Sequence, residues 1–208
     1  MRFGIFIYDE VEPIDLATYG VLSMARRVVP EIEICTIAPE SGVVRLSNGL
    51  RVMADYGLND APACDMLVVT GGAGWVAQAN NPDVLAFLRS RSRQTRLASV
   101  CTGAMILAAA GVLDGKKATT KREVVAPEMP PIDVMRQRFP AIDVQTASVV
   151  DCESVTTGGG VTLCIDTMLH IIGREFGMAA AKETARIIEY SRAWDANQRV
   201  LPVVANEQ

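Results

Sequence analysis

The sequence predicts an α/β fold with a mostly parallel sheet and helices on both of its faces. Apolar runs of strand length alternate along the chain with segments of helical period, which is typical of repeated β-α units. The chain has 208 residues, of which 50% are hydrophobic and 21% charged, enough to bury one sizeable core. We therefore expect a single domain over residues 1–208, with residues 191–208 as a C-terminal tail.

The first half of the chain contains clear turn and cap signals between its apolar runs. Asn48-Gly49 is a strong hairpin signal. Asn81 suits the N-cap of a helix, and Pro82 suits its first position. The expected elements are strands at 3–8, 32–38 and 66–70, helices at 13–27 and 82–93, and a hairpin at 43–53.

Glycine and proline also divide the second half. Gly111 ends one helical segment, and Pro127 and Pro130 interrupt the chain before the next. The expected strands are at 97–100, 117–119, 142–150 and 154–157, and the expected helices are at 103–110, 132–139, 161–176 and 178–192.

Ligands of open α/β sheets bind beyond the carboxyl ends of the strands. Four loops should meet at that edge. Glu12 and Asp15 follow the first strand, Gly71 to Gly74 follow the central one, Cys101 follows the next, and residues 156–160 end the closing strand. We expect the pocket there, with Gly71, Trp75, Thr157, Gly160 and Val161 among its residues.

Cys101 is the strongest candidate for a reactive residue. It stands on a sharp strand-to-helix turn, followed by small residues that suit close packing of the helix on the sheet. This is the geometry of a nucleophile elbow, with Cys in place of Ser. Backbone N–H groups and the helix dipole at such a turn favour thiolate over thiol. The other four cysteines are expected to be small buried hydrophobes.

Asp15 is the candidate proton carrier beside Cys101, and Glu12 is the competing acid. The alternative is that Asp15 is only a first-turn acid of its helix. Backbone N–H groups at Gly72 and Thr102 are candidates for binding a developing negative charge. Trp75 either forms a wall of the pocket or covers the core.

His170, the single histidine, is expected to pair with Asp166 far from the pocket. No general base of imidazole type is therefore evident beside Cys101. Gly72 to Ala77 fit the dinucleotide pattern GxGxxA, but this segment follows an internal strand, and the next strand ends without a carboxylate. We reject that alternative and expect no cofactor.

The composition of the chain excludes several classes of binding partner. The net charge of -4 and the pI near 5.1 leave no positive field for nucleic acid. The five cysteines include no CxxC pair, and their context suggests neither a metal site nor disulfides. No segment has the composition of a signal peptide or a membrane span. We expect a cytoplasmic protein that binds a small molecule and no membrane.

Five motifs together resemble the ThiJ/PfpI superfamily: Ile14 to Leu16, Val69 to Gly74, Ser99 to Ala104, Leu113 to Thr120, and Thr157 to Val161. The resemblance implies a flavodoxin-like three-layer sandwich related to class I glutamine amidotransferases, and commonly a homodimer. Within the superfamily the pattern is most similar to isocyanide hydratases and to the sensing domains of AraC-type regulators.

In the hydratases the motif cysteine attacks the isocyanide carbon to give a thioimidate, an aspartate moves the proton, and water releases an N-formamide. The resemblance assigns these roles to Cys101 and Asp15. Three departures matter. Thr102 stands where protease-like members have His, Lys121 follows Thr119-Thr120 where His is usual, and Asp15 replaces the Glu of glyoxalase members.

Two kinds of function follow. The first is a cysteine-dependent hydro-lyase that acts on a small electrophile, such as an isocyanide. The alternative is a non-catalytic small-molecule sensor or an oxidative-stress-responsive protein in which Cys101 is oxidised. A DNA-binding regulator is not expected from these residues alone, because too little sequence follows Arg192 for a helix-turn-helix region.

Overall fold

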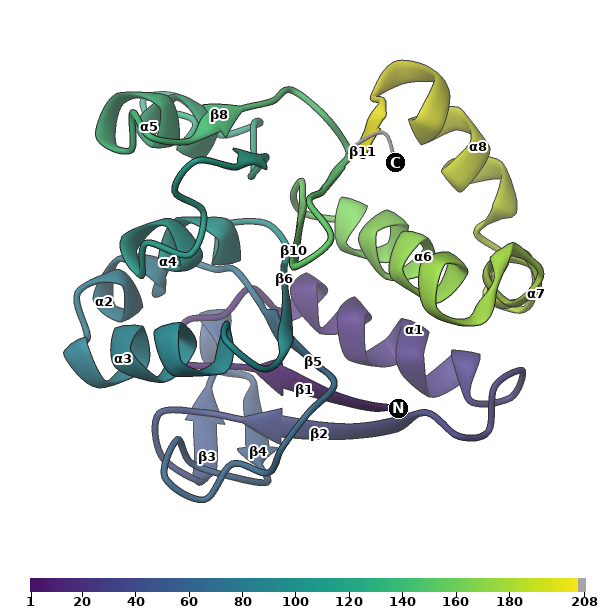
Figure 1. Ribbon diagram of the computed structural model, residues 1–208, viewed down its shortest axis with the longest axis horizontal. Coiled ribbons are helices and arrows are strands. Elements are labelled where there is room, and N and C mark those ends of the chain that lie inside the picture. Colours follow the sequence, from purple (N-terminus) through teal and green to yellow (C-terminus); the bar gives the residue numbers. More distant parts are fainter. Residues whose placement is uncertain (206–208) are drawn as a thin grey trace.

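The computed structural model describes residues 1–205 and has a seven-stranded sheet at its centre (Figure 1). The strands are β1 (Arg2–Phe6), β2 (Glu33–Ile37), β5 (Met66–Val69), β6 (Arg96–Ser99), β9 (Val149–Asp151), β10 (Val155–Gly158) and β11 (Val203–Ala205). Their order is β11-β9-β10-β6-β5-β1-β2, and only the β9–β10 pair is antiparallel. The predicted mostly parallel sheet is confirmed.

Helices cover both faces of this sheet. One layer contains α1 (Ala17–Ala25), α6 (Leu163–Phe176) and α7 (Met178–Ile187), and the other contains α2 (Trp75–Ala79), α3 (Pro82–Arg91) and α4 (Gly103–Ala109) (Figure 1). All four residues of β5 are buried, as expected for a strand with helices on both sides. The predicted three-layer α/β sandwich is confirmed.

Asn81 caps α3 as predicted, since its side chain accepts hydrogen bonds from the backbone N–H groups of Asp83 and Val84. The predicted hairpin is also confirmed. It consists of β3 (Gly42–Arg45) and β4 (Arg51–Ala54), joined through the 3-10 turn η2 (Ser47–Gly49). A second 3-10 turn, η1 (Pro13–Leu16), precedes α1.

The strand predicted over residues 142–150 is divided in two. Its first part, β8 (Asp143–Val144), pairs with β7 (Lys117–Ala118) in a separate two-stranded sheet, and its last part is β9. The backbone between β8 and β9 forms hydrogen bonds outside both sheets' ladders. The carbonyl of Ala147 accepts from Thr119 Oγ1, and the carbonyl of Ser148 accepts from Gly159 N–H. The helix α5 (Pro131–Arg138) lies beside β8.

The prediction of one last helix over 178–192 is wrong. Glu189 adopts a φ of 57°, in the left-handed region that helices do not continue through, and it separates α7 from α8 (Ser191–Val200). After α8, β11 pairs with β9 and extends the sheet. The segment predicted as a C-terminal tail, 191–208, thus contains a helix and a strand. Residues 206–208, the end of the expected tail, lie outside the described residues.

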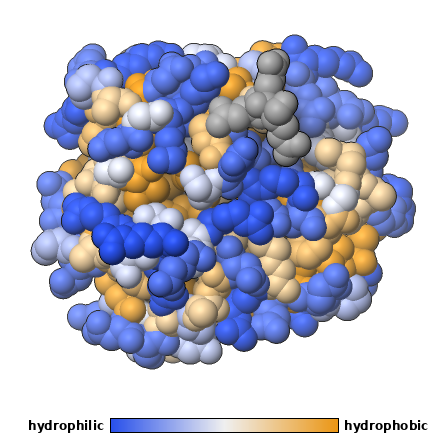
Figure 2. All heavy atoms as spheres, in the orientation of Figure 1, coloured by the Kyte–Doolittle hydropathy of each residue, from blue (hydrophilic) through white to orange (hydrophobic). Residues whose placement is uncertain are grey.

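The surface in the same orientation is mainly hydrophilic, and apolar atoms are visible in a hollow at the left and in a patch at the lower right (Figure 2). Within residues 1–205, no helix combines the length and the apolar character that crossing a bilayer requires.

Candidate active site

Cys101 stands on the turn between β6 and α4, with a φ of 51°. A non-glycine residue rarely adopts this left-handed conformation, and holding it costs on the order of 1–3 kcal/mol. The surroundings fix the residue in place: its N–H donates to Gly159 O at 3.0 Å, and its carbonyl accepts from Thr120 Oγ1 at 2.8 Å. The backbone therefore has the strained turn of a nucleophile elbow.

Two glycines allow this turn to pack closely. A Cβ on Gly103 would overlap the carbonyl oxygen of Val69, so the glycine lets α4 begin directly against β5. A Cβ on Gly160 would lie 2.8 Å from Cys101 Sγ. The bare backbone of Gly160 therefore leaves room for the sulfur.

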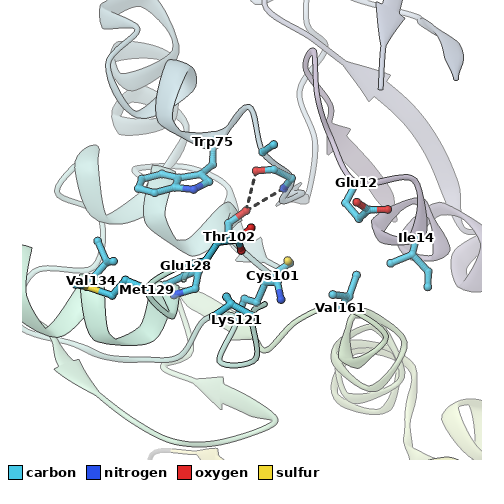
Figure 3. Close-up of a pocket in the computed structure, with 14 residues that line it drawn as sticks. Glu12, Ile14, Trp75, Cys101, Thr102, Lys121, Glu128, Met129, Val134 and Val161 are labelled. Carbon is cyan, nitrogen blue, oxygen red and sulfur yellow. Dashed lines mark hydrogen bonds between the residues drawn. The ribbon is translucent and has the colours of Figure 1, made fainter. Parts of the chain in front are cut away.

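A cavity of about 710 Å³ opens above Cys101. This is within the usual size range for small-molecule sites, roughly 300–1,000 Å³. Figure 3 shows Cys101 and Thr102 at the centre, Trp75 on one side, and Glu12, Ile14 and Val161 on the other. Most of the wall is apolar. The lining residues are Glu12, Ile14, Gly72, Ala73, Trp75, Cys101, Thr102, Lys121, Val124, Glu128, Met129, Pro131, Val134 and Val161.

Some residues expected at the pocket lie behind its wall. Thr157 is buried, and its hydroxyl accepts a hydrogen bond from the Thr119 N–H at 2.9 Å, so it supports the loop beneath the cavity rather than lining it. Gly71 and Gly160 are also outside the lining, whereas Val161 is part of it. Trp75 lines the cavity and also packs against the core, which combines the two alternatives for this residue.

The predicted charge-binding group at Gly72 is already occupied. Its N–H donates to Thr102 Oγ1 at 2.9 Å, and the same hydroxyl donates to Gly72 O at 3.2 Å (dashed lines in Figure 3). Because this pair is closed, Gly72 N–H becomes available to a ligand only if the Thr102 side chain moves. The interaction does join the glycine loop to the elbow, as the predicted meeting of loops requires.

Asp15 is fully buried next to the glycine loop, and it does not line the cavity. Its Oδ2 accepts a hydrogen bond from Gly71 N–H at 2.7 Å, whereas its Oδ1 has no hydrogen-bond partner among the described residues. Burial raises the pKa of Asp15 to about 7, against the lowering effect of Gly71 N–H, and the charge of Glu12 raises it further. Asp15 is thus a carboxyl group that changes protonation near neutral pH.

Burial acts against the thiolate that we expect at Cys101. Burial is the main cause that raises the pKa of this thiol to about 12, and the charge of Asp15 adds to it. The backbone N–H of Thr102 and the charge of Lys121 act in the opposite direction but are outweighed. Burial thus favours the thiol form of Cys101, and a neighbouring base that takes its proton would make it a nucleophile.

The segment from Lys121 to Val134 supplies a wall of the cavity that the sequence did not predict. Lys121 packs its stem near Gly160, and its ammonium donates to the Glu123 carbonyl. Val124 and Met129 bring apolar surface from a proline-rich stretch that we interpreted only as a helix breaker. The apolar side chains of this loop were the sequence feature that could have indicated a cavity wall.

His170 pairs with Asp151 rather than with Asp166, which corrects the sequence expectation. The distance from Nε2 to Asp151 Oδ2 is 2.8 Å, and Arg174 donates to the same carboxylate. Burial acts to raise the pKa of Asp151, but the His170 hydrogen bond and the Arg174 charge outweigh it and lower the pKa to about 2. Asp166 is occupied by Tyr190, whose hydroxyl donates to it at 2.9 Å. The single histidine of the chain is thus engaged away from Cys101.

A family model described as the DJ-1/PfpI family matches residues 1–174. The chain belongs to the DJ-1/PfpI family. The superfamily expected from the sequence motifs is thereby confirmed, and with it the flavodoxin-like fold. Within residues 1–205, no group of three or more His, Cys, Asp or Glu side chains is arranged to hold a metal ion.

Relatives within this family differ in what their names describe. The HTH-type transcriptional regulator GbdR of Pseudomonas aeruginosa is 36% identical over 169 residues, which cover 79% of this chain and 44% of the regulator. The chain thus spans less than half the length of that regulator. The isonitrile hydratase of Pseudomonas putida is 31% identical over 195 residues, which cover 93% of this chain and 80% of the hydratase.

Among solved structures, a ThiJ/PfpI family protein from Pseudomonas syringae is similar with a TM-score of 0.79 and 26% identity. The match covers 91% of this chain and 74% of that one.

Proposed function

We propose that this protein is a cysteine-dependent hydratase of small apolar isocyanides, which it converts to N-formamides. The observation that carries the proposal is the buried Asp15 carboxyl, with an unpartnered oxygen and a pKa of about 7, beside a Cys101 thiol on a strained turn. Such a pair can pass one proton back and forth without an imidazole. The similarity to the isonitrile hydratase supports the same substrate class.

The first half of the reaction forms a carbon–sulfur bond. Ionised Asp15 takes the proton of the Cys101 thiol while the sulfur attacks the terminal carbon of the isocyanide, R–N≡C. Asp15 then gives this proton to the same carbon, which yields the thioimidate R–N=CH–S–Cys101. Atoms and charge balance, and Asp15 is again a carboxylate.

The second half uses water. Asp15 accepts a proton from a water molecule as the water oxygen attacks the thioimidate carbon, and it passes this proton to the nitrogen. The tetrahedral intermediate R–NH–CH(OH)–S–Cys101 then expels the sulfur. Asp15 carries the proton of the hydroxyl group to the sulfur, and the product is R–NH–CHO. The net reaction adds one water to the isocyanide. Thr102 N–H, which already lowers the pKa of the Cys101 sulfur, is the proposed donor to negative charge on that atom.

The cavity supports an apolar R group. Ile14, Trp75, Met129, Val134 and Val161 form walls without charge around the space above the sulfur. Glu12 and Lys121 are the charged lining residues closest to the chemistry in this scheme, and the charge of Lys121 lowers the pKa of both Asp15 and Cys101. Lys121 would thus favour the ionised states that the first step requires.

The test is formamide production from cyclohexyl isocyanide and a panel of alkyl and aryl isocyanides, followed by gas chromatography. We expect turnover by the wild-type protein and a loss of at least a thousandfold in Cys101→Ala. Asp15→Asn should lose at least a hundredfold. Cys152→Ala, a cysteine outside the cavity, is the matched control and should retain activity.

Glu12→Gln separates the two candidate acids. It should change the apparent affinity for substrate but leave most of the rate, because Glu12 lines the cavity and Asp15 is the group that moves the proton in this scheme. A wild-type protein that is inert toward the whole panel contradicts the proposal.

A second candidate is a ligand-sensing domain without turnover. It is favoured by the 36% identity to a transcriptional regulator and by the burial that raises the pKa of Cys101. A sensor would show a rise in melting temperature with a small apolar ligand and release no product. We also propose that the protein is a homodimer. Light scattering of the same protein sample, which gives the molar mass in solution, tests this.

A further inference from the structure

Two cysteines outside the cavity, Cys35 and Cys64, meet beside Gly4. Gly4 on β1 pairs with Cys35 on β2, so the positions of their side chains lie on the same face of the sheet. A Cβ on Gly4 would lie 3.0 Å from Cys64 Sγ. Because Gly4 has no side chain, the Cys64 sulfur can lie over β1, next to the position of Cys35 on β2.

The two thiols are unequal. The neighbouring Cys35 thiol is the main cause that lowers the pKa of Cys64 to about 7, and Cys64 in turn raises the pKa of Cys35. The Cys64 thiol itself donates to the carbonyl of Pro62 at 3.6 Å. Burial opposes the lowering at Cys64, the charges of Arg91 and Arg2 support it, and Asp65 opposes it. Cys64 is thus the thiol of the pair that ionises more readily.

The two arginines are fixed next to Cys64 by the segment that precedes it. Arg91 donates to the carbonyls of Pro62 and Ala61, at 3.0 and 2.6 Å, and Arg2 donates to the carbonyl of Ala63 at 3.4 Å. Cys64 is partly exposed, and Cys35 is buried with 8% of its surface accessible. Arg2 is also paired with Glu33 at 2.7 Å, so Arg91 is the less compensated of the two positive charges. A partly exposed thiol beside an arginine and a second thiol is the arrangement of redox-reactive cysteines.

We propose that Cys64 and Cys35 form a peroxide-reactive dithiol that closes to a disulfide, separate from the Cys101 site. The Cys64 thiolate attacks one oxygen of hydrogen peroxide, giving a sulfenic acid and hydroxide, which takes up the proton that Cys64 lost. The Cys35 thiol then attacks the sulfenic sulfur, and its proton leaves with the hydroxyl group as water. Two thiols are oxidised by two electrons, and one peroxide is reduced to two waters.

The dithiol and the Cys101 site use opposite ends of the sheet. Cys64 precedes the first residue of β5, whereas Cys101 follows the last residue of the parallel neighbour β6. The proposal therefore does not depend on the proposed hydratase function.

Peptide mapping tests the proposal directly. The intact protein is treated with equimolar hydrogen peroxide at pH 7, capped with iodoacetamide and digested with trypsin. The sequence places Cys35 in the peptide 28–45 and Cys64 in the peptide 52–89. We expect a linked pair of these two peptides, lighter by two hydrogens than their sum, as the first oxidation product. Cys101→Ala should form it at the same rate.

Alkylation without oxidant provides an independent measure. A thiol with a pKa near 7 is about half ionised at pH 7, against about 3% for an ordinary thiol, but its thiolate is several-fold less nucleophilic. Iodoacetamide should therefore label Cys64 about threefold faster than free cysteine in solution. Cys35→Ala should slow this labelling, because it removes the neighbouring thiol that lowers the pKa of Cys64.

Two results would overturn the proposal. One is the absence of the linked peptides at peroxide doses that oxidise Cys152. The other is a Cys64 that stays a sulfenic acid, trapped by dimedone equally in the wild-type protein and in Cys35→Ala, since Cys35 would then not resolve it. If Cys35→Ala does not fold, Cys35→Ser serves in its place, and the wild-type peptide map decides by itself.

Discussion

Replacing Asp15 by Asn should remove a pH dependence of stability that the wild-type protein has between about pH 4 and pH 7. Burial is the main cause that raises the pKa of this carboxyl from 3.8 to about 7 in the folded protein. In this window the folded chain holds a proton that the unfolded chain releases. The stabilisation is fully present below about pH 3.8, and it is lost as the pH rises to about 7.

The size of the effect follows from the same two pKa values. Each pH unit changes the free energy of unfolding by about 1.4 kcal/mol while only the folded state stays protonated. Between pH 5 and pH 7 the wild-type protein should therefore lose about 2 kcal/mol through Asp15 alone. Asparagine does not titrate, so Asp15→Asn loses nothing by this route. Asp15 is completely buried, and solvent screening does not reduce the value.

Urea unfolding at pH 5, 6 and 7, followed by tryptophan fluorescence, measures both proteins. Subtracting the two stability curves removes the titrations that they share. The free energy of unfolding of the wild-type protein minus that of Asp15→Asn should fall by about 2 kcal/mol from pH 5 to pH 7. Asp195→Asn, which changes an exposed carboxyl, should give a curve parallel to the wild type. Parallel curves for Asp15→Asn as well would refute the raised pKa.

Three further predictions test the site and its support. Iodoacetamide should label Cys101 slowly at pH 8, and Asp15→Asn should speed the labelling because it removes a charge that raises the pKa of the thiol. Mass spectrometry of the peptide 97–116 gives both rates. Gly160→Ala should cut that labelling and formamide production at least tenfold, since the new Cβ would lie 2.8 Å from the sulfur. Tyr190→Phe should lower the free energy of unfolding by about 1–2 kcal/mol in urea, because buried Asp166 loses a hydrogen bond.

Most of the sheet could be predicted because its strands carry their own signal. A fully apolar run such as Met66 to Val69 predicts a buried strand by itself. The C-terminal elements carry no such signal. Trp194 is the only buried residue of α8, and the helix is held by distant contacts, in which Tyr190 and Asn197 donate to Asp166 on α6. Local pattern does not reveal such contacts.

The site shows the same division between local and distant effects. The glycines and the turn at Cys101 are features of the local chain, and they predicted an elbow. The ionisation of Cys101 depends on how deeply the completed fold buries it, and this outweighs the nearby backbone N–H. The partner of His170 was also a distant one, since a carboxylate on β9 replaces the neighbour one turn away on the helix.

The Cys101 site and the Cys35–Cys64 pair should differ in their reactivity toward peroxide, because their pKa values differ. Cys101 has a pKa of about 12, so its thiolate is scarce at neutral pH until a substrate carbon is in place and Asp15 takes the proton. Peroxide in solution meets little thiolate there. At Cys64 the neighbouring thiol and two arginines already lower the pKa to about 7. Oxidant should therefore reach the dithiol first, and the nucleophile of the proposed hydratase should survive doses that close the Cys35–Cys64 disulfide.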